Sequence, residues 1–349
     1  MKIINKFMPS KYQEEQRILQ SELISSSMLF EGVVGGVIYR GKERPFILKD
    51  SDKNLHKGIR KTAKEYFKEN HITWWGGGKD VIGHVLSSQV ACINHLFPLR
   101  NNNAALCKML NEVLGLEIER MLPIPEWLDK KESKEHYIAF EAISRYDHLN
   151  EDKENKGLTR GSNCTSIDAL MIAKMEDGSV MLLPIEWKYT EAYNNEDKSN
   201  KDRKYKDEEL NKKEKGKNGK GIERVNRYSS LIDESEILKS EKNYFGSFYF
   251  QEPFYQLMRQ TLWAERVIKI EPNEWYGATK CLHLHIIPSA NKDLLNRNYR
   301  RFPWMNGLKE SWESKLVDKS EYRIIDPKDL LSPVIDESLK KYLCQRYWQ

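Results

Sequence analysis

Short apolar runs separated by charged loops dominate the central part of this chain. Ile59, Ala63, Tyr66 and Phe67 fall near helical spacing and predict a helix over 57–70. An apolar stripe over 80–97 predicts a core helix that ends before Pro98. Strands are predicted at 137–141, 167–173, 180–189 and 281–287, and an amphipathic helix at 254–267. The pattern therefore predicts a mixed α/β fold with the order helix, three strands, helix, strand.

An Asp-Gly turn joins the second and third of these predicted strands and decides which side chains share a face. Glu186 and Lys188 point the same way along one strand, about 7 Å apart. A two-residue loop at Asp177-Gly178 would place Asp168 opposite Trp187, away from both. A bulge, or a loop of three or five residues, would return Asp168 to their face. We predict such an irregularity, and Pro184 within the returning strand is a candidate for marking it.

Asp168, Glu186 and Lys188 are the residue types that metal-dependent phosphodiester hydrolysis needs. Carboxylate oxygens bind Mg²⁺, which keeps several waters, polarises a phosphoryl oxygen and lowers the pKa of bound water. A lysine beside the metal can orient or deprotonate the attacking water, or stabilise developing charge. The simpler alternative to a catalytic site is a Glu186–Lys188 salt bridge on a solvent-exposed strand face. The apolar runs on both strands weigh against this alternative. Placing charged side chains at the ends of buried strands costs free energy, which is typical of functional sites.

The composition and the cysteine spacing argue against several other classes of protein. The 349 residues are 39% hydrophobic and 31% charged, as in a soluble globular protein, and can form one large core or two smaller ones. The five cysteines form no CxxC pair, which argues against zinc knuckles and thiol redox chemistry. No apolar run is long enough for a membrane span or a signal peptide, so we expect a cytoplasmic protein with no membrane partner. The net charge of +5 is compatible with a polyanionic partner.

The order of elements resembles the core of the PD-(D/E)XK nuclease superfamily, the restriction-endonuclease-like fold, over residues 80–288. The stretch 160–169 together with 186–191 also resembles a bacterial group of restriction endonucleases within it. The resemblance implies an αβββαβ core with a mixed central sheet flanked by helices. It implies that Asp168 and Glu186 bind Mg²⁺, with Mn²⁺ as a substitute, and that Lys188 is the catalytic lysine. Ile167 stands where the superfamily often has proline.

Other polar residues are weaker candidates. Glu141 ends the first core strand, where a third carboxylate could reach the metal, or it is an ordinary solvated strand end. Gln256 and Gln260 share a helix face, and some branches of the superfamily carry a polar residue there. The remaining candidates have bland alternatives: His283 and His285 as core histidines rather than ligands, and Trp74 and Trp75 as buried residues rather than base-stacking ones.

Three regions are expected from these patterns. Residues 1–79 form an N-terminal extension packed on the core, 80–288 the nuclease core, and 289–349 a C-terminal extension with Arg and Trp residues that contact DNA or pack. The core carries a charged insertion at 194–221, either a solvated mobile loop or an arm touching phosphates.

Three functions remain open. The leading hypothesis is a Mg²⁺-dependent endonuclease on duplex DNA, of the restriction or defence type and a possible homodimer. The alternatives are a repair, recombination or mobile-element nuclease acting on DNA ends or branches, and a non-catalytic DNA-binding protein on a nuclease-like fold.

Overall fold

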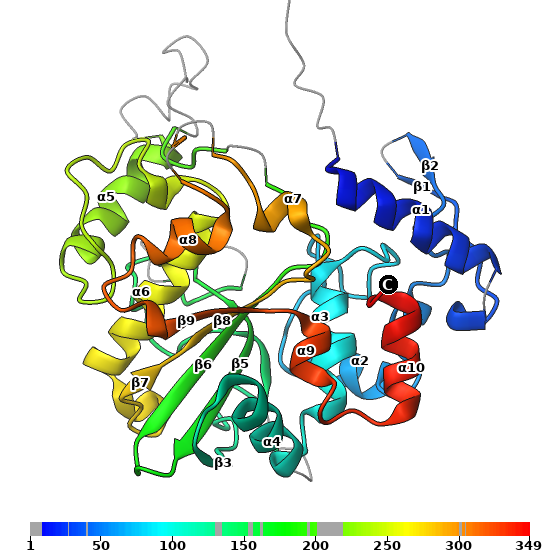
Figure 1. The fold of residues 1–349 in the computed structure, drawn as a ribbon, viewed down its shortest axis with the longest axis horizontal. Coiled ribbons are helices and arrows are strands. Elements are labelled where there is room, and N and C mark those ends of the chain that lie inside the picture. Colours follow the sequence, from blue (N-terminus) through cyan, green and yellow to red (C-terminus); the bar gives the residue numbers. More distant parts are fainter. Residues whose placement is uncertain are drawn as a thin grey trace, which may run out of the picture.

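The computed structural model describes residues 9–26, 28–39, 41–129, 135–152, 156–160, 163–193, 196–200, 219–299, 302–303 and 305–349. Figure 1 shows the helices and strands of these residues. The helices are α1 Lys11–Ser26, α2 Arg60–Glu69, α3 Ser88–Leu96, α4 Asn103–Leu114, α5 Lys220–Asp233, α6 Phe254–Ile270, α7 Lys292–Leu295, α8 Leu308–Glu313, α9 Pro327–Leu331 and α10 Glu337–Arg346. The strands are β1 Val37–Tyr39, β2 Lys42–Arg44, β3 Ile118–Met121, β4 Ala139–Ala142, β5 Ile167–Met175, β6 Val180–Trp187, β7 Lys280–Cys281, β8 His283–Ile286 and β9 Tyr322–Ile325.

Within the described residues, one mixed sheet of seven strands forms the centre of the molecule. Its order is β3-β5-β6-β8-β9, with β4 also paired to β5 and β7 also paired to β6. The pairs among β3, β4, β5 and β6 are antiparallel, whereas β6, β7, β8 and β9 pair in parallel. A central mixed sheet flanked by helices is thus confirmed. Strands β1 and β2 form a separate two-stranded hairpin.

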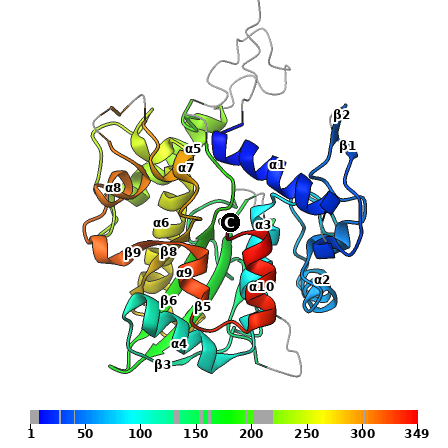
Figure 2. The same cartoon turned by 45° about the vertical axis from the view of Figure 1, so that its right-hand side comes forward.

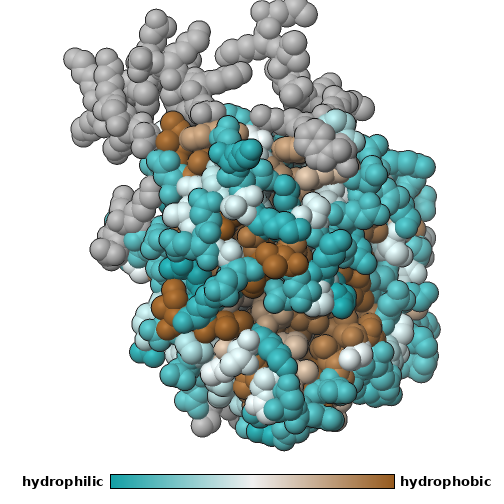
Figure 3. All heavy atoms as spheres, turned by 60° about the vertical axis from the view of Figure 1, so that its left-hand side comes forward, coloured by the Kyte–Doolittle hydropathy of each residue, from teal (hydrophilic) through white to brown (hydrophobic). Residues whose placement is uncertain are grey.

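Helices cover both faces of the sheet, as Figures 1 and 2 show. On one face Met171 and Ile185 pack in a hydrophobic cluster with residues of α2, α3, α4 and α10. On the other face Leu170 and Leu182 pack with residues of α5, α6 and α8. Figure 3 brings the α5 and α8 side forward, where hydrophobic side chains gather in patches between hydrophilic ones. Alternate residues of β5 and β6 therefore enter different cores, which is why both strands read as nearly continuous apolar runs.

Most predicted elements are confirmed, with shifted ends. Strand β5 contains the predicted 167–173 strand, and β6 ends two residues before the predicted position 189. The predicted 281–287 strand is divided into β7 and β8, and β4 replaces the predicted strand at 137–141. Strands β3 and β9 were not predicted from the sequence. Strand β9 comes from the predicted C-terminal extension and pairs with β8, so this region contributes to the central sheet.

The helix predicted over 80–97 is too long at its start. Helix α3 begins at Ser88, and the Ser87 side chain caps it by accepting a hydrogen bond from the Val90 N–H. Residues 83–85 instead bond to a neighbouring backbone segment, since the Gly83 carbonyl accepts from Leu48 and Val85 donates to Phe46. The apolar spacing of this segment reflects packing of an irregular chain rather than a helical turn.

The charged insertion predicted at 194–221 lies largely outside the described residues. In its described part, Asp197 forms an isolated β-bridge with Gln251, and α5 begins at Lys220. Residues 161–162 of the stretch 160–169 also lie outside the described residues. Across the described parts of the chain, no helix has the length and apolar character needed to span a bilayer.

Candidate active site

Four residues separate β5 from β6, and because Met175 pairs with Ser179 the turn itself has three residues, 176–178, which brings Asp168 to the face of Glu186. Met175 N–H donates to the Ser179 carbonyl over 2.9 Å, and Gly178 adopts φ 82°. From there the pairing continues without a shift to Ala169 and Ile185. Continuing this register by one residue places Asp168 opposite Glu186. The prediction that the hairpin gains a residue is therefore confirmed, and it makes the two carboxylates neighbours across the strands.

Pro184 does not mark a bulge, so that part of the prediction is wrong. It pairs with Leu170, and the same register holds on both sides of it. Lys188 N–H donates to the Ile286 carbonyl on β8. Because backbone donors alternate along a strand, the nitrogen of residue 184 also faces the β8 side. The proline nitrogen, which has no N–H to donate, therefore faces the Leu282 region, between β7 and β8. The pairing of β6 with β5 on the other side does not need this donor and stays intact.

Buried polar contacts connect Glu186 and Lys188 to α6. The Lys188 ammonium donates to Glu186 Oε1 and, over 2.7 Å, to Gln256 Oε1. Gln260 Nε2 donates to the second oxygen of Glu186, and Gln260 Oε1 lies 2.8 Å from His283 Nε2. Glu186, Lys188, Gln260 and His283 are buried. The two glutamines predicted from their shared helix face both reach the strand residues, and they fix the orientation of the carboxylate and the ammonium.

Glu141, Asp168 and Glu186 form a row of carboxylates across three adjacent strands, here called the acid row. Strand β4 pairs with β5 on both sides of Glu141, which places Glu141 at the level of Asp168. Glu141 adopts φ 49°, a left-handed conformation that is rare outside glycine and common at functional sites. Asp168 and Glu141 are half-buried, whereas Glu186 is fully buried. Asp168 Oδ2 accepts a hydrogen bond from Trp187 N–H over 2.8 Å.

Burial and the proximity of charged groups shift the pKa values of Asp168, Glu141 and Lys188. Burial, reinforced by the negative charges of Glu186 and Glu141, raises the pKa of the Asp168 carboxyl well above its usual range. Burial also raises the pKa of Glu141, against the hydrogen bonds that it accepts from Gln89 and Ser166. Burial opposes the charge of Lys188, but the adjacent Glu186 carboxylate holds the pKa of the ammonium well above its usual range. Lys188 is therefore protonated at neutral pH.

The acid row fits a hard divalent cation by its chemistry. It supplies carboxylate oxygens that repel one another, and a cation would relieve that repulsion. Both Glu186 oxygens accept hydrogen bonds, yet each carboxylate oxygen has a second lone pair. Of the residues that the structure describes, no three His, Cys, Asp or Glu side chains are arranged to hold a metal on their own. Water or substrate oxygens would have to complete the coordination, as is usual for Mg²⁺.

The histidine and tryptophan candidates lie outside this cluster of polar contacts, except for the His283 contact with Gln260. His283 and His285 are buried, and His285 Nδ1 lies 2.9 Å from the Tyr322 hydroxyl, so both are core histidines. Trp74 is buried as expected, stacked on Phe67 with ring centroids 3.9 Å apart. The expectation of burial is wrong for Trp75, which is 54% exposed, because it lies on the loop that follows α2 and precedes three glycines.

Two residues beside Glu141 were not predicted from the sequence. Gln89, on α3, donates to Glu141 Oε1 over 2.7 Å. Arg160 donates through Nε to the Glu141 carbonyl over 2.7 Å and through Nη1 to the Asn70 carbonyl over 3.0 Å. Neither contact could be predicted from the periodicity of the sequence, because each joins residues that are far apart in the chain.

A mixed sheet flanked by helices, with two carboxylates and a lysine near one another on its central hairpin, is compatible with a restriction-endonuclease-like fold. A family model described as "Restriction Endonuclease associating with ARP" matches residues 31–348. The chain belongs to this family. No curated protein and no solved structure matches the chain.

Proposed function

We propose that this protein is a Mg²⁺-dependent endonuclease that hydrolyses phosphodiester bonds of duplex DNA, in a restriction or defence role and on a PD-(D/E)XK core. The observation that carries the proposal is the meeting of Asp168, Glu186 and Lys188 on one face of the β5–β6 hairpin. Membership in a restriction endonuclease family supports the nuclease and defence parts. The Mg²⁺ requirement, the duplex substrate and a homodimer are the finer parts of the proposal.

Asp168 and Glu186 would hold the metal together with water or substrate oxygens, and Glu141 would reach it through a bound water. When bound, Mg²⁺ would polarise the phosphoryl oxygen and lower the pKa of a bound water. The protonated Lys188 ammonium supplies positive charge beside Glu186 and donates hydrogen bonds to the attacking water or to the phosphate oxygen that gains charge. Gln256 and Gln260 limit the rotation of both side chains, so the charges are oriented before the substrate arrives.

Plasmid cleavage in the presence of Mg²⁺ tests this proposal. We expect wild-type protein to nick or linearise plasmid DNA, with Mn²⁺ able to replace Mg²⁺. Glu186→Gln and Lys188→Met should each lower the cleavage rate by roughly 100-fold or more, because each removes a charge that acts on the reacting phosphate. Glu176→Gln is the matched control, since Glu176 is exposed in the loop of the same hairpin.

Two results would refute the proposal: no cleavage of any DNA, or cleavage that both site variants leave unchanged. Linear, nicked and branched DNA should be compared in the same assay. Cleavage restricted to ends or branches would favour a repair or recombination nuclease over a restriction enzyme.

A further inference from the structure

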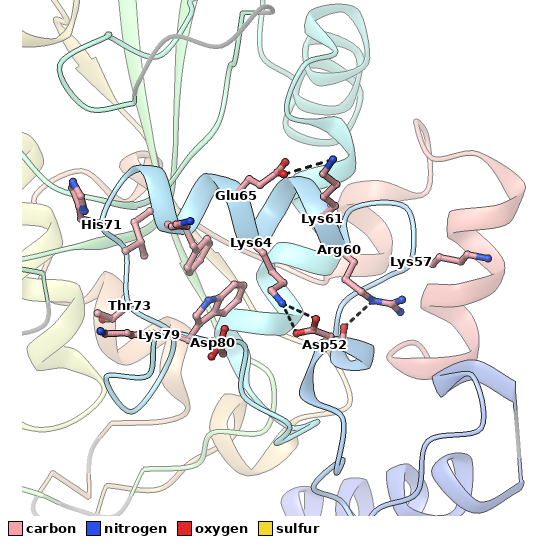
Figure 4. A pocket seen from close by; sticks show the side chains of 14 residues that line it. Asp52, Lys57, Arg60, Lys61, Lys64, Glu65, His71, Thr73, Lys79 and Asp80 are labelled. Carbon is pink, nitrogen blue, oxygen red and sulfur yellow. Dashed lines mark hydrogen bonds and ion pairs between the residues drawn. The ribbon is translucent and has the colours of Figure 1, made fainter.

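A basic groove lies beside α2, away from the contacts that hold Glu186 and Lys188. It has a volume of about 1090 Å³ and lies between α2 and the segments that precede and follow this helix; it is here called the α2 groove. Figure 4 shows charged side chains of α2 and of both flanking segments around it. Its basic lining residues are Lys57, Arg60, Lys61, Lys64, Lys68 and Lys79, against three acidic ones, Asp52, Glu65 and Asp80.

Part of this positive charge is already neutralised. Lys64 contacts Asp52 at 2.6 Å, Lys61 lies 3.8 Å from Glu65, and Arg60 pairs with Glu31 outside the groove. Among the described residues, Lys57, Lys68 and Lys79 have no acidic partner, and all three are exposed. One acid, Asp80, is likewise without a described cationic partner. The groove therefore keeps an excess of positive charge open to solvent.

One side chain joins the wall of the α2 groove to the acid row. Thr73 and Trp74 line the groove. Gln89 Nε2 donates both to the Thr73 carbonyl, over 3.3 Å, and to Glu141 Oε1, over 2.7 Å. Gln89 Oε1 accepts from Trp75 N–H over 2.8 Å. A ligand in the groove would thus lie close to Glu141. This connection to the acid row distinguishes the groove from an ordinary solvated basic helix face.

The dimensions suit a nucleic acid backbone. Ten residues of α2 span about 15 Å, the length of about four base pairs along a duplex axis. Lys68 lies on this helix, Lys57 precedes it and Lys79 follows it, so the groove offers a lysine at each of three places to contact a phosphate. Such contacts position DNA without reading its sequence. The exposed Trp75 follows Trp74 of the groove wall, and its N–H donates to Gln89, which also contacts Glu141.

We infer that the α2 groove binds the sugar–phosphate backbone of the duplex DNA that the acid row cuts, on one side of the scissile phosphodiester. The inference rests on the proposed function for the position of the cut, but DNA binding in the groove can be tested without cleavage. Lys57, Lys68 and Lys79 are the residues that contact phosphates.

Fluorescence anisotropy of a labelled 30-bp duplex, titrated at several salt concentrations, tests the inference on the full-length protein. The triple variant Lys57→Gln, Lys68→Gln, Lys79→Gln should bind on the order of tenfold more weakly. Its log–log salt slope should fall by about 0.9 for each phosphate that the variant no longer neutralises, up to about 2.7. In a cleavage assay KM should rise, with kcat little changed.

The matched control is Lys242→Gln, Lys309→Gln, Lys319→Gln. These lysines are exposed, belong to the part of the chain around α5, α8 and β9, and change the net charge by the same amount. The control should bind like wild type. Equal losses of affinity in both triple variants, equal binding by the groove variant and wild type, or no duplex binding by wild-type protein would each overturn the inference. Duplex binding that depends on the groove in a protein that cuts no DNA would support the groove and refute the nuclease proposal.

Discussion

The Asp168 carboxyl faces Glu186 across the hairpin and Glu141 across the neighbouring strand, with Lys188 as the cation on the same face. Its pKa is higher in the folded protein than in the unfolded chain, so folding favours the protonated form. The stability linked to this group is fully present below the unfolded pKa, near 3.8, and is lost as the pH rises through the folded pKa. Near neutral pH without metal, Asp168 therefore lowers the stability of the fold.

Asp168→Asn should consequently stabilise the metal-free protein while impairing cleavage. Asparagine can still accept the Trp187 N–H, but it carries no charge. In EDTA at pH 8 we expect the free energy of unfolding to rise by roughly 0.5–2 kcal/mol, and the gain to shrink toward pH 4. Urea unfolding across this pH range measures both effects. Asp80→Asn, at an exposed position, is the control and should show little change. A gain that does not vary with pH would contradict the assigned role of charge repulsion.

Among the elements, the β5–β6 hairpin was the most predictable from sequence. Its apolar runs, its Asp-Gly signal and the need to bring Asp168 to the face of Glu186 together indicated an extra loop residue, which the structure has. Pro184 misled because sequence does not show which side of a strand a nitrogen faces. The start of α3 was misplaced because the spacing of buried side chains continues through an irregular segment that bonds to Phe46 and Leu48.

The loop of this hairpin depends on Gly178, which adopts φ 82°. A side chain there would strain the backbone even though its Cβ would meet Lys174 Nζ only at an ordinary contact distance of 3.9 Å. Gly178→Ala should therefore lower the free energy of unfolding by about 1–2 kcal/mol. Gly178→Asn should lower it less, because asparagine tolerates the left-handed region better. Urea denaturation of the two variants gives the comparison. Equal stability of alanine, asparagine and glycine at this position would contradict the loop geometry.

Across the whole molecule, residues from both ends of the chain support the strand that carries the site. Arg346 on α10 is buried and donates through Nη1 to the Asn54 carbonyl over 2.6 Å. Its own carbonyl accepts from Gln20 on α1, and Gln20 also donates to the hydroxyl of Tyr189, the residue after Lys188. These contacts were beyond sequence reasoning, because they join positions up to 326 residues apart. Gln89 was missed for the same reason.

Arg346→Met should lower the free energy of unfolding by roughly 2–4 kcal/mol, because it leaves the buried Asn54 oxygens without their charged donor. Lys341→Met on the exposed side of the same helix is the control, with an expected change within about 0.5 kcal/mol. Thermal unfolding of both variants measures the difference. Similar melting temperatures for the two would show that the ends of the chain do not support the core as described.

Sequencing the DNA ends produced from a complex DNA sample is the sharpest test of the proposed cleavage at the acid row. Wild-type protein with Mg²⁺ should create new ends above background, and their flanking sequences would report any recognition site. Glu186→Gln protein at the same concentration should create none. The proposed cleavage would be contradicted if wild-type protein produced no ends with Mg²⁺ or Mn²⁺, or if the Glu186→Gln variant produced the same ends at the same rate.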